Sequence, residues 1–427
     1  MSEGRKTALF GGVALALVLV TWATAPRFAT PAIFAERGEL LFSEFRDPNS
    51  AASLEITEFD ARNATIRPFK VQNYDGRWTI PSQHDYPADA KDRLAQTAAA
   101  LVGLRKDDIA SDNAADYERY GVLDPLDTTL PTLNGRGSRL LVRGAHDQVL
   151  ADVIVGKAVE GHTGFRYLRK PGQKRVYVSN VGALSLSTAF GDWIERDLLQ
   201  VAGEDIDAVN LRNYSLDRST GLVNPGETLL LQKAQDKWTI NGLGATEELN
   251  LNALDAMLRN LAKLRIVGVL PKPLGISATL NGEISNATVS QEDKADLARK
   301  GFYLTPTGQL VSNLGEIVVR SAQGVFYTLR FGDIAPESDA PAEDTPPASN
   351  GASAPATSPR ENRYLFIMVN FDPQSARTPG RASEGSQTAR LLRARFAPWY
   401  YVIAADSFAK IRVQRRDLVK PKGVAPR

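Results

Sequence analysis

The chain has 427 residues, of which 43% are hydrophobic and 23% are charged, a composition typical of a folded protein with two or three domains. Fifty-one basic and forty-nine acidic residues give a net charge of +2 at pH 7, which argues against nucleic acid as a partner. The absence of cysteine excludes disulfides and thiolate chemistry, and three histidines argue against a histidine-rich metal site.

The amino-terminal region contains an uncharged apolar run at residues 7–26. That length is enough for a helix to cross a bilayer core of roughly 30 Å. Two basic residues precede the run, so the positive-inside tendency places residues 1–6 in the cytoplasm. Residues 23–25 also have the small-x-small pattern of a signal-peptide cleavage site, but Pro26 directly after them disfavours cleavage. We therefore predict an uncleaved single-pass anchor in the inner membrane, with the bulk of the chain in the periplasm.

A pattern centred on a tryptophan occurs twice in the chain, and each member of the second set lies 160 positions after its counterpart. The first set is Trp78, Thr79, Ile80, Leu94, Leu101, Leu104 and Arg105, and the second is Trp238, Thr239, Ile240, Leu254, Leu261, Leu264 and Arg265. A constant spacing without gaps indicates a tandem duplication. We predict two similar domains, at residues 39–200 and 205–420.

The first repeat alternates apolar and polar residues in short segments joined by turn residues, which is typical of strands. The predicted strands are residues 53–56, 66–71, 77–80, 139–143, 149–155, 164–169 and 175–178. An amphipathic helix is predicted between Pro87 and Leu104, and a helical stretch at residues 193–199 ends the repeat. This order predicts an α+β domain with a mainly antiparallel sheet and packed helices.

The second repeat shows the same order of elements. Its helix is predicted at residues 250–265, and residues 316–320 match the strand at 139–143. Residues 335–360 and 372–389 have few large apolar side chains, so we predict them to be disordered loop insertions. Residues 421–427 form a short basic tail.

The aromatic residues are the main candidates for a binding surface. Trp78 and Trp238 could stack on a sugar or a peptide, but we interpret them as core residues because both copies carry them at the same place. Trp193 is also assigned to the core. Trp399, Tyr400 and Tyr401 are candidates for an aromatic interface, since aromatic residues are enriched at interface centres.

Catalytic motifs are weak in this sequence. Ser407 and Lys410 fit Ser-x-x-Lys, and residues 111–113 read Ser-Asp-Asn, a combination known from serine β-lactamases. The chain order is wrong for that family, because its Ser-x-x-Lys precedes the other motif. No Walker loop, nucleophile elbow or His-Glu-x-x-His helix is present. We therefore predict no enzyme activity and no catalytic, cofactor-binding or metal residues.

Several segments of the first repeat together carry a family resemblance. They are the Trp78 strand with its helix, Tyr120-Gly121-Val122-Leu123-Asp124-Pro125, residues 153–156, Tyr167 with residues 176–178, and residues 196–198. In this order they resemble the bacterial family catalogued as domain of unknown function 4340. The second copy departs from the pattern at residues 300–304.

The resemblance implies a membrane-anchored envelope protein, because members are often encoded beside permease and ATPase components of ABC-type transport systems, including ones similar to gliding-motility machinery. No catalytic residue follows from it. The expected function is that of a non-enzymatic accessory or scaffold protein anchored by residues 7–26, with ABC-type permease and ATPase subunits as partners. The alternative is a periplasmic glycan- or peptide-binding module that uses Trp399 and Tyr400 in a groove between the repeats.

Overall fold

The computed structural model describes residues 36–61, 64–182, 184, 186–195, 197–217, 220, 222–281, 289–305, 308–336, 361–377 and 382–422. These residues pack into two compact units. Of the described residues, those within 36–51, 57–66 and 95–184 form unit 1, and those within 52–56, 67–94 and 186–422 form unit 2. Residues 67–94 of the predicted first repeat thus pack with unit 2.

The predicted cytoplasmic tail (residues 1–6) and membrane helix (residues 7–26) lie outside the described residues, and so do residues 337–360 and 423–427. Among the helices that are described, none is both long and apolar enough to cross a membrane.

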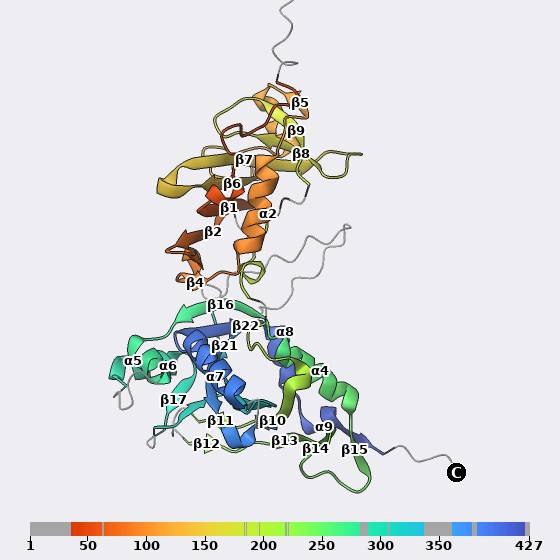
Figure 1. Cartoon of the computed structure of the whole chain (residues 1–427), viewed down its shortest axis with the longest axis vertical. Coiled ribbons are helices and arrows are strands. Elements are labelled where there is room, and N and C mark those ends of the chain that lie inside the picture. Colours follow the sequence, from red (N-terminus) through yellow and green to blue (C-terminus); the bar gives the residue numbers. More distant parts are fainter. Residues whose placement is uncertain are drawn as a thin grey trace, which may run out of the picture. The chain divides into compact units, whose positions relative to one another are not determined.

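Within the described residues, the first sheet has nine strands in the order β4-β3-β2-β1-β6-β7-β8-β9-β5 (Figure 1). The strands are β1 (Ser53–Asp60), β2 (Thr65–Tyr74), β3 (Arg77–Ile80), β4 (Tyr86–Pro87), β5 (Asp108–Ser111), β6 (Ser138–Arg143), β7 (Val149–Ala158), β8 (Phe165–Arg169) and β9 (Val176–Asn180). β1 and β2 each contribute residues to both units.

The second sheet lies in unit 2 and has, in the described part of the chain, eight strands in the order β14-β13-β10-β19-β20-β21-β22-β16. They are β10 (Ile206–Arg212), β13 (Thr228–Ala234), β14 (Lys237–Ile240), β16 (Ile266–Pro271), β19 (Glu316–Ser321), β20 (Val325–Ile334), β21 (Arg363–Phe371) and β22 (Trp399–Ile403). The strand order of the first sheet, starting at β3, is the same as that of the second sheet, starting at β14. In both, the strand after the first long helix returns to the far edge.

The remaining elements are short. The helices are α2 (Lys91–Val102), α3 (Tyr117–Tyr120), α4 (Leu251–Ala262), α5 (Leu274–Asn281), α6 (Gln291–Arg299), α7 (Ala382–Phe396), α8 (Ala405–Ile411) and α9 (Arg415–Leu418). Three strand pairs stand apart from the sheets: β11 (Ser215–Leu216) with β12 (Val223–Asn224), β15 (Glu247–Leu249) with β23 (Val419–Pro421), and β17 (Phe302–Leu304) with β18 (Leu310–Ser312).

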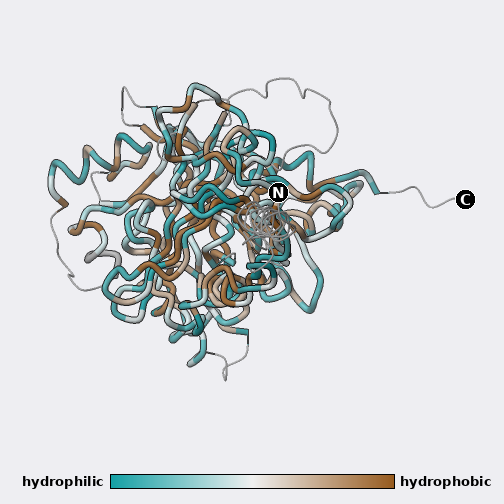
Figure 2. Tube along the Cα trace, turned by 90° about the horizontal axis from the view of Figure 1, so that it is seen from above, coloured by the Kyte–Doolittle hydropathy of each residue, from teal (hydrophilic) through white to brown (hydrophobic). Residues whose placement is uncertain are grey.

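The predicted combination of helices with mainly antiparallel sheets is confirmed, and local sequence explains the helices that position the site. The Asn250 side chain accepts a hydrogen bond from the Ala253 N–H and so begins α4. α4 then buries Leu254, Leu258 and Leu261, which lie on one face of the helix. Brown apolar segments alternate with teal polar ones along the trace in Figure 2, as expected for elements with one buried face.

The helix predicted at residues 193–199 is wrong. A 3-10 turn, η5 (Phe190–Asp192), precedes an irregular stretch that buries Trp193, Ile194, Leu198 and Leu199. Those four positions are spread around a helix with 3.6 residues per turn, so a single helical face could not bury them all.

The predicted disorder of residues 372–389 is also wrong where the structure describes them. A 3-10 turn, η8 (Pro373–Ser375), is followed by α7, whose first half covers residues 382–389. Ala389, Leu392 and Phe396 are buried along one side of α7, so a few apolar residues at helical spacing hold a mostly polar segment. Ala335, the first residue of the other predicted insertion, is buried too, and its N–H donates to the Asn362 carbonyl at 2.8 Å.

The predicted basic tail begins within ordered structure. Pro421 ends β23, and the Lys422 N–H donates to the Thr246 carbonyl at 2.9 Å. The end of the described chain is therefore attached to unit 2.

Candidate functional site

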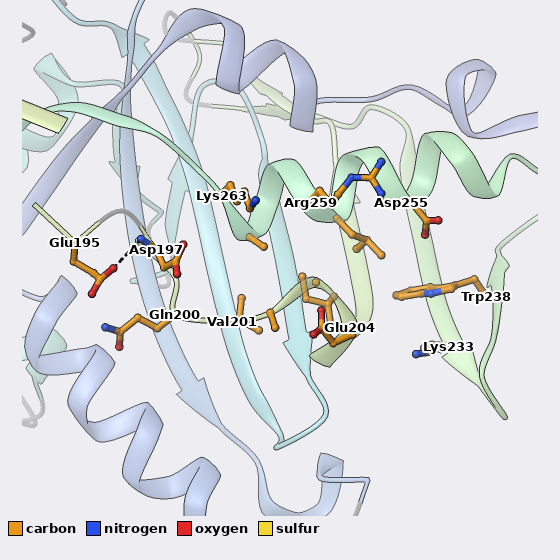
Figure 3. Close-up of a pocket in the computed structure, with 15 residues that line it drawn as sticks. Glu195, Asp197, Gln200, Val201, Glu204, Lys233, Trp238, Asp255, Arg259 and Lys263 are labelled. Atoms are coloured by element: carbon orange, nitrogen blue, oxygen red, sulfur yellow. Dashed lines mark hydrogen bonds between the residues drawn. The ribbon is translucent and has the colours of Figure 1, made fainter. Parts of the chain in front are cut away.

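Unit 2 carries a groove of about 930 Å³ that is formed by three segments of the chain (Figure 3). One wall is α4, another is the hairpin of β13 and β14, and the third is the segment from Glu195 to Ile206, which includes the 3-10 turn η6 (Gly203–Asp205). We call this space the Trp238 groove, because the indole of Trp238 lies at one end of it beside α4.

The hairpin turn positions Trp238. Gln235 and Asp236 have φ values of +46° and +61°, as a tight two-residue turn requires, and Lys233 pairs with Trp238 one pair after the turn. This place is at the margin of the sheet, so the indole is half-buried. Ile240, two residues later on the same sheet face, is the residue that enters the core.

The assignment of Trp78 and Trp238 to the core is therefore corrected. Trp78 has the same position on β3, one pair after its hairpin turn, and it is half-buried as well, whereas Ile80 is fully buried. A repeated Trp-Thr-Ile strand thus places its isoleucine in the core and leaves its tryptophan at the edge.

The polar face of α4 supplies charges of both signs to the groove. Asp255, Arg259 and Lys263 follow one another at spacings of four residues, which places them along one face of the helix. All three side chains are exposed, and no ion pair joins any of them to another part of the described chain. They are free to contact a ligand.

The opposite wall is acidic. Glu195 and Glu204 line it, and the Glu195 carboxylate accepts a hydrogen bond from the Asp197 N–H at 3.2 Å. No hydroxyl, thiol or imidazole side chain is among the described residues that line the groove. The groove thus offers an aromatic face and charged groups of both signs, which suit reversible binding of a ligand.

The predicted aromatic interface at residues 399–401 is corrected at two positions. Tyr400 and Tyr401 have no exposed surface, because β22 lies inside the sheet between β21 and β16 and is covered on both faces. The Tyr400 ring stacks on Phe302 with centroids 6.0 Å apart. Burial raises the pKa of the Tyr401 hydroxyl well above its ordinary value. Trp399, at the start of β22, is half-buried.

Trp193 is fully buried. Its ring packs on Phe69 with centroids 5.4 Å apart, and the Arg93 guanidinium lies 5.3 Å from the ring centroid. The indole N–H donates to the Ser187 carbonyl at 2.9 Å, so its one polar group is satisfied.

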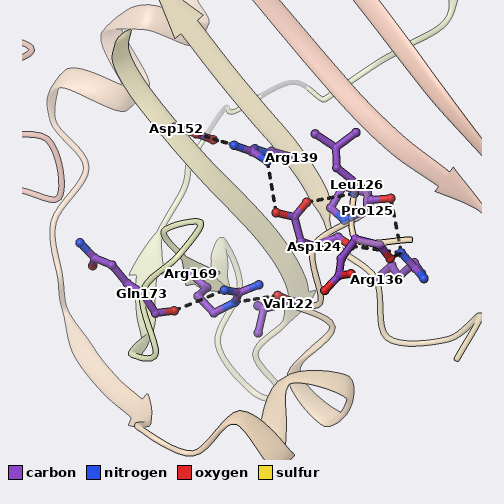
Figure 4. A network of polar contacts seen from close by, with 10 residues as sticks. Val122, Asp124, Pro125, Leu126, Arg136, Arg139, Asp152, Arg169 and Gln173 are labelled. Carbon is purple, nitrogen blue, oxygen red and sulfur yellow. Dashed lines mark hydrogen bonds and ion pairs between the residues drawn. The ribbon is translucent and has the colours of Figure 1, made fainter. Parts of the chain in front are cut away.

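One of the segments that carry the family resemblance, Tyr120 to Pro125, takes part in a polar network of unit 1 (Figure 4). Arg139 on β6 bridges Asp124 at 3.2 Å and Asp152 at 2.7 Å, and Arg169 on β8 donates to the Val122 carbonyl at 2.9 Å. Arg136 donates to carbonyl oxygens of the same loop, including that of Asp127 at 2.7 Å. The segment from Tyr120 to Pro125 is thus fixed to the sheet by arginines, which is a structural role.

A glycine of the sheet makes close packing of this segment possible. A Cβ atom on Gly156 of β7 would lie 2.5 Å from the Tyr120 carbonyl oxygen and 2.7 Å from Val122 Cγ1. In the second sheet, a Cβ atom on Gly332 of β20 would collide in the same way with the Lys300 carbonyl oxygen. Gly121 and Gly301, one residue after these carbonyls, both have positive φ. The two sheets therefore hold equivalent segments in the same manner.

No group of three acidic or histidine side chains with the arrangement of a metal site is found among the residues that the structure describes.

Comparison with known proteins gives one match. Residues 78–279 match the model of the family described as Domain of unknown function (DUF4340). This match supports the resemblance drawn from the sequence. It begins at Trp78, includes the network around Arg139, and ends within α5. No curated protein and no solved structure matches the chain.

Sequence reasoning missed most of the Trp238 groove. The polar face of α4 was visible in the helix pattern, but the acidic wall comes from an irregular segment about 60 residues earlier, whose position depends on tertiary packing. The position of Trp238 could have been predicted from the alternation of side chains along β14. Ile240 lies on the same face of the strand and already fills the core position, which leaves Trp238 at the edge.

Proposed function

We propose that this protein is a non-enzymatic accessory or scaffold subunit of an ABC-type transport assembly, anchored in the inner membrane by residues 7–26 with its two units in the periplasm. The family match and the apolar amino-terminal run support this proposal. The observation that carries the binding role is the Trp238 groove, where an aromatic face meets unpaired charges of α4. Buried aromatic and arginine side chains commonly contribute most of the binding free energy in protein interfaces.

The first test is a crosslinking pull-down from native membranes with a tag after Arg427. A photoreactive amino acid replaces Arg259, and crosslinked chains are identified by mass spectrometry. We expect a permease subunit and an ATPase subunit to co-purify, with the permease crosslinked at position 259. Recovery of this chain alone would overturn the proposal.

A pair of variants then tests the groove itself. Trp238→Ala should reduce recovery of the partner by about tenfold or more, because interface hot spots contribute roughly 2 kcal/mol or more each. Tyr74→Ala removes an aromatic ring of unit 2 that is 70% exposed and does not line the groove, so it should leave recovery unchanged. Equal recovery with both variants would exclude the Trp238 groove as the docking place.

A periplasmic glycan- or peptide-binding module is the alternative. The sequence placed the ligand site of such a module at Trp399 and Tyr400, but Tyr400 is buried. Trp238, beside Asp255 and Arg259, provides a different candidate site. A tryptophan face with nearby carboxylate and guanidinium groups can stack on a sugar ring and bind its hydroxyls. Titration of the full chain with envelope glycans and peptides tests this: binding should weaken in Trp238→Ala without a lower melting temperature.

We also propose that the two sheets arose by tandem duplication. The support is the shared strand order, the constant spacing of 160 residues, and the equivalent packing of Gly156 and Gly332. Alanine at either glycine should then destabilise its own unit by a similar amount.

A further inference from the structure

Unit 2 contains a second cavity, of about 950 Å³, whose lining is largely apolar. It is bounded by α5, α6, the β17–β18 pair and one face of β20 and β21. Its volume falls within the range of roughly 300–1,000 Å³ typical of ligand pockets. The apolar residues used in the argument below are Leu297, Leu304, Leu310, Phe366 and Met368.

The cavity is an open side of the hydrophobic core. Leu297 and Phe366 are buried members of one core cluster, whereas Leu304, Leu310 and Met368 pack against that cluster and remain partly exposed. Apolar surface left in contact with water costs about 25 cal/mol per Å² relative to burial. An apolar ligand that covers these side chains would therefore bind favourably.

One end of the cavity is cationic. Glu316 is buried there and lies between two arginines, with Arg212 Nη1 at 2.7 Å and Arg330 Nε at 3.0 Å. Lys294 also lines the cavity, is exposed, and forms no ion pair within the described chain. Among the residues that line the cavity, three cations and one carboxylate leave an excess of two positive charges.

The two guanidinium groups keep hydrogen-bonding capacity for an anion. Each guanidinium has five N–H donors. Arg330 Nη1 donates to the Met368 sulfur at 3.0 Å, whereas Nε forms only the ion pair with Glu316 and has no hydrogen-bond acceptor among the described residues. Arg212 uses Nη1 for Glu316, and its side chain is 53% exposed. Arginine donors in this arrangement match the planar geometry of carboxylate and phosphate oxygens.

We propose that this cavity binds an anionic amphiphile, with one acyl chain along Leu310 and Met368 and its carboxylate or phosphate at Arg212 and Lys294. The chain would cover the partly exposed apolar side chains, and the head group would neutralise the excess positive charge. A free fatty acid and an anionic phospholipid share this chemistry.

The described residues at the matching place in unit 1 have a different arrangement. The position of β6 that corresponds to Glu316 in β19 is Arg139, and it is held by two carboxylates instead of two arginines. The rings of Tyr120 and Tyr167 pack there with centroids 4.4 Å apart, against the core residues Val122, Ile154 and Val176. The two matched places thus differ in charge, and the described residues leave the core open at the one in unit 2.

The test is photolabelling of the full chain in nanodiscs of zwitterionic phosphatidylcholine. A diazirine-bearing 16-carbon fatty acid is added and irradiated, and labelled peptides are located by mass spectrometry. We expect labelling at peptides that contain Leu310 or Met368, and we expect oleate to suppress it. Labelling confined to other peptides would overturn the proposal.

Two further probes separate the parts of the proposal. A diazirine-bearing phosphatidylglycerol labels the same peptides if the source is a bilayer lipid, and fails to do so if the cavity takes only free fatty acid. A diazirine-bearing 16-carbon alcohol lacks the anion and should label weakly. Equal labelling by the alcohol would refute the role of the cationic end.

Variants on one helix complete the test. Lys294→Gln should reduce labelling roughly two- to fivefold, the range expected for one exposed ion pair. Arg299→Gln removes a cation of α6 that does not line the cavity and should leave labelling unchanged. Both residues are exposed, so both variants should fold. Equal labelling of the two variants would contradict the head-group position.

Discussion

The packing of Gly332 gives the sharpest test of the fold. A Cβ atom at this position would lie 2.8 Å from Phe302 Cζ and closer still to the Lys300 carbonyl oxygen. The carbonyl belongs to the backbone, so it cannot move without displacing the strand β17. Gly332→Ala should therefore cost roughly 1–3 kcal/mol of overpacking, offset by about 0.4–1 kcal/mol from the stiffer unfolded chain.

The resulting loss of about 1–2 kcal/mol corresponds to a melting temperature lower by roughly 2–8 °C for a unit of this size. Scanning calorimetry of the full chain measures it. Gly191→Ala is the matched control, because a Cβ atom there would meet nothing within 4 Å and the residue does not have a positive φ. If Gly332→Ala melts within about 1 °C of Gly191→Ala, the close approach of β20 to the Lys300 carbonyl is refuted.

Three further predictions concern buried groups. Burial lowers the pKa of Lys272 well below its ordinary value of 10.5. Between the folded pKa and 10.5 the unfolded state therefore binds more protons than the folded state, so the free energy of unfolding rises with pH in that range. Lys272→Met should abolish this rise, as measured by denaturant titrations at several pH values. Trp193→Ala should lower the free energy of unfolding by about 3–5 kcal/mol, as measured by urea denaturation, because the whole ring is buried. Arg139→Met should lower the free energy of unfolding by roughly 1.5–3 kcal/mol, because it leaves two carboxylates without their ion-pair partner. Arg143→Met is the control: its partner Asp147 is exposed, so this variant should be nearly neutral in the same assay.

The framework of the fold was predictable because it depends on local periodicity. The strands at residues 139–143 and 149–155 alternate apolar and polar side chains, and the structure places β6 and β7 there. The helix of the second repeat was predicted at residues 250–265 and is found as α4, with its buried leucines on one face. These signals need no information about distant parts of the chain.

The errors arose where tertiary contacts override composition. Residues 382–396 look polar, yet Ala389 and Phe396 are buried and hold them as a helix packed on β21. Tyr400 and Tyr401 look like interface residues, but β22 lies between two other strands and buries both. Nothing in the residues themselves reveals which strands will be neighbours in a sheet.

The Trp238 groove and the apolar cavity of unit 2 were also beyond sequence reasoning, since each is assembled from segments far apart in the chain. The charge at the start of β19 shows why. Arg139 and Glu316 occupy matched positions in the two sheets, and either residue alone reads as an ordinary surface charge. In the structure, the arginine is held by two carboxylates in a closed network, whereas the glutamate holds two arginines beside an open apolar cavity. If duplication produced both sheets, the two copies have diverged at this place, because the core is closed there in unit 1 and opens beside a cationic group in unit 2. Binding properties should therefore differ between two units that share one strand order.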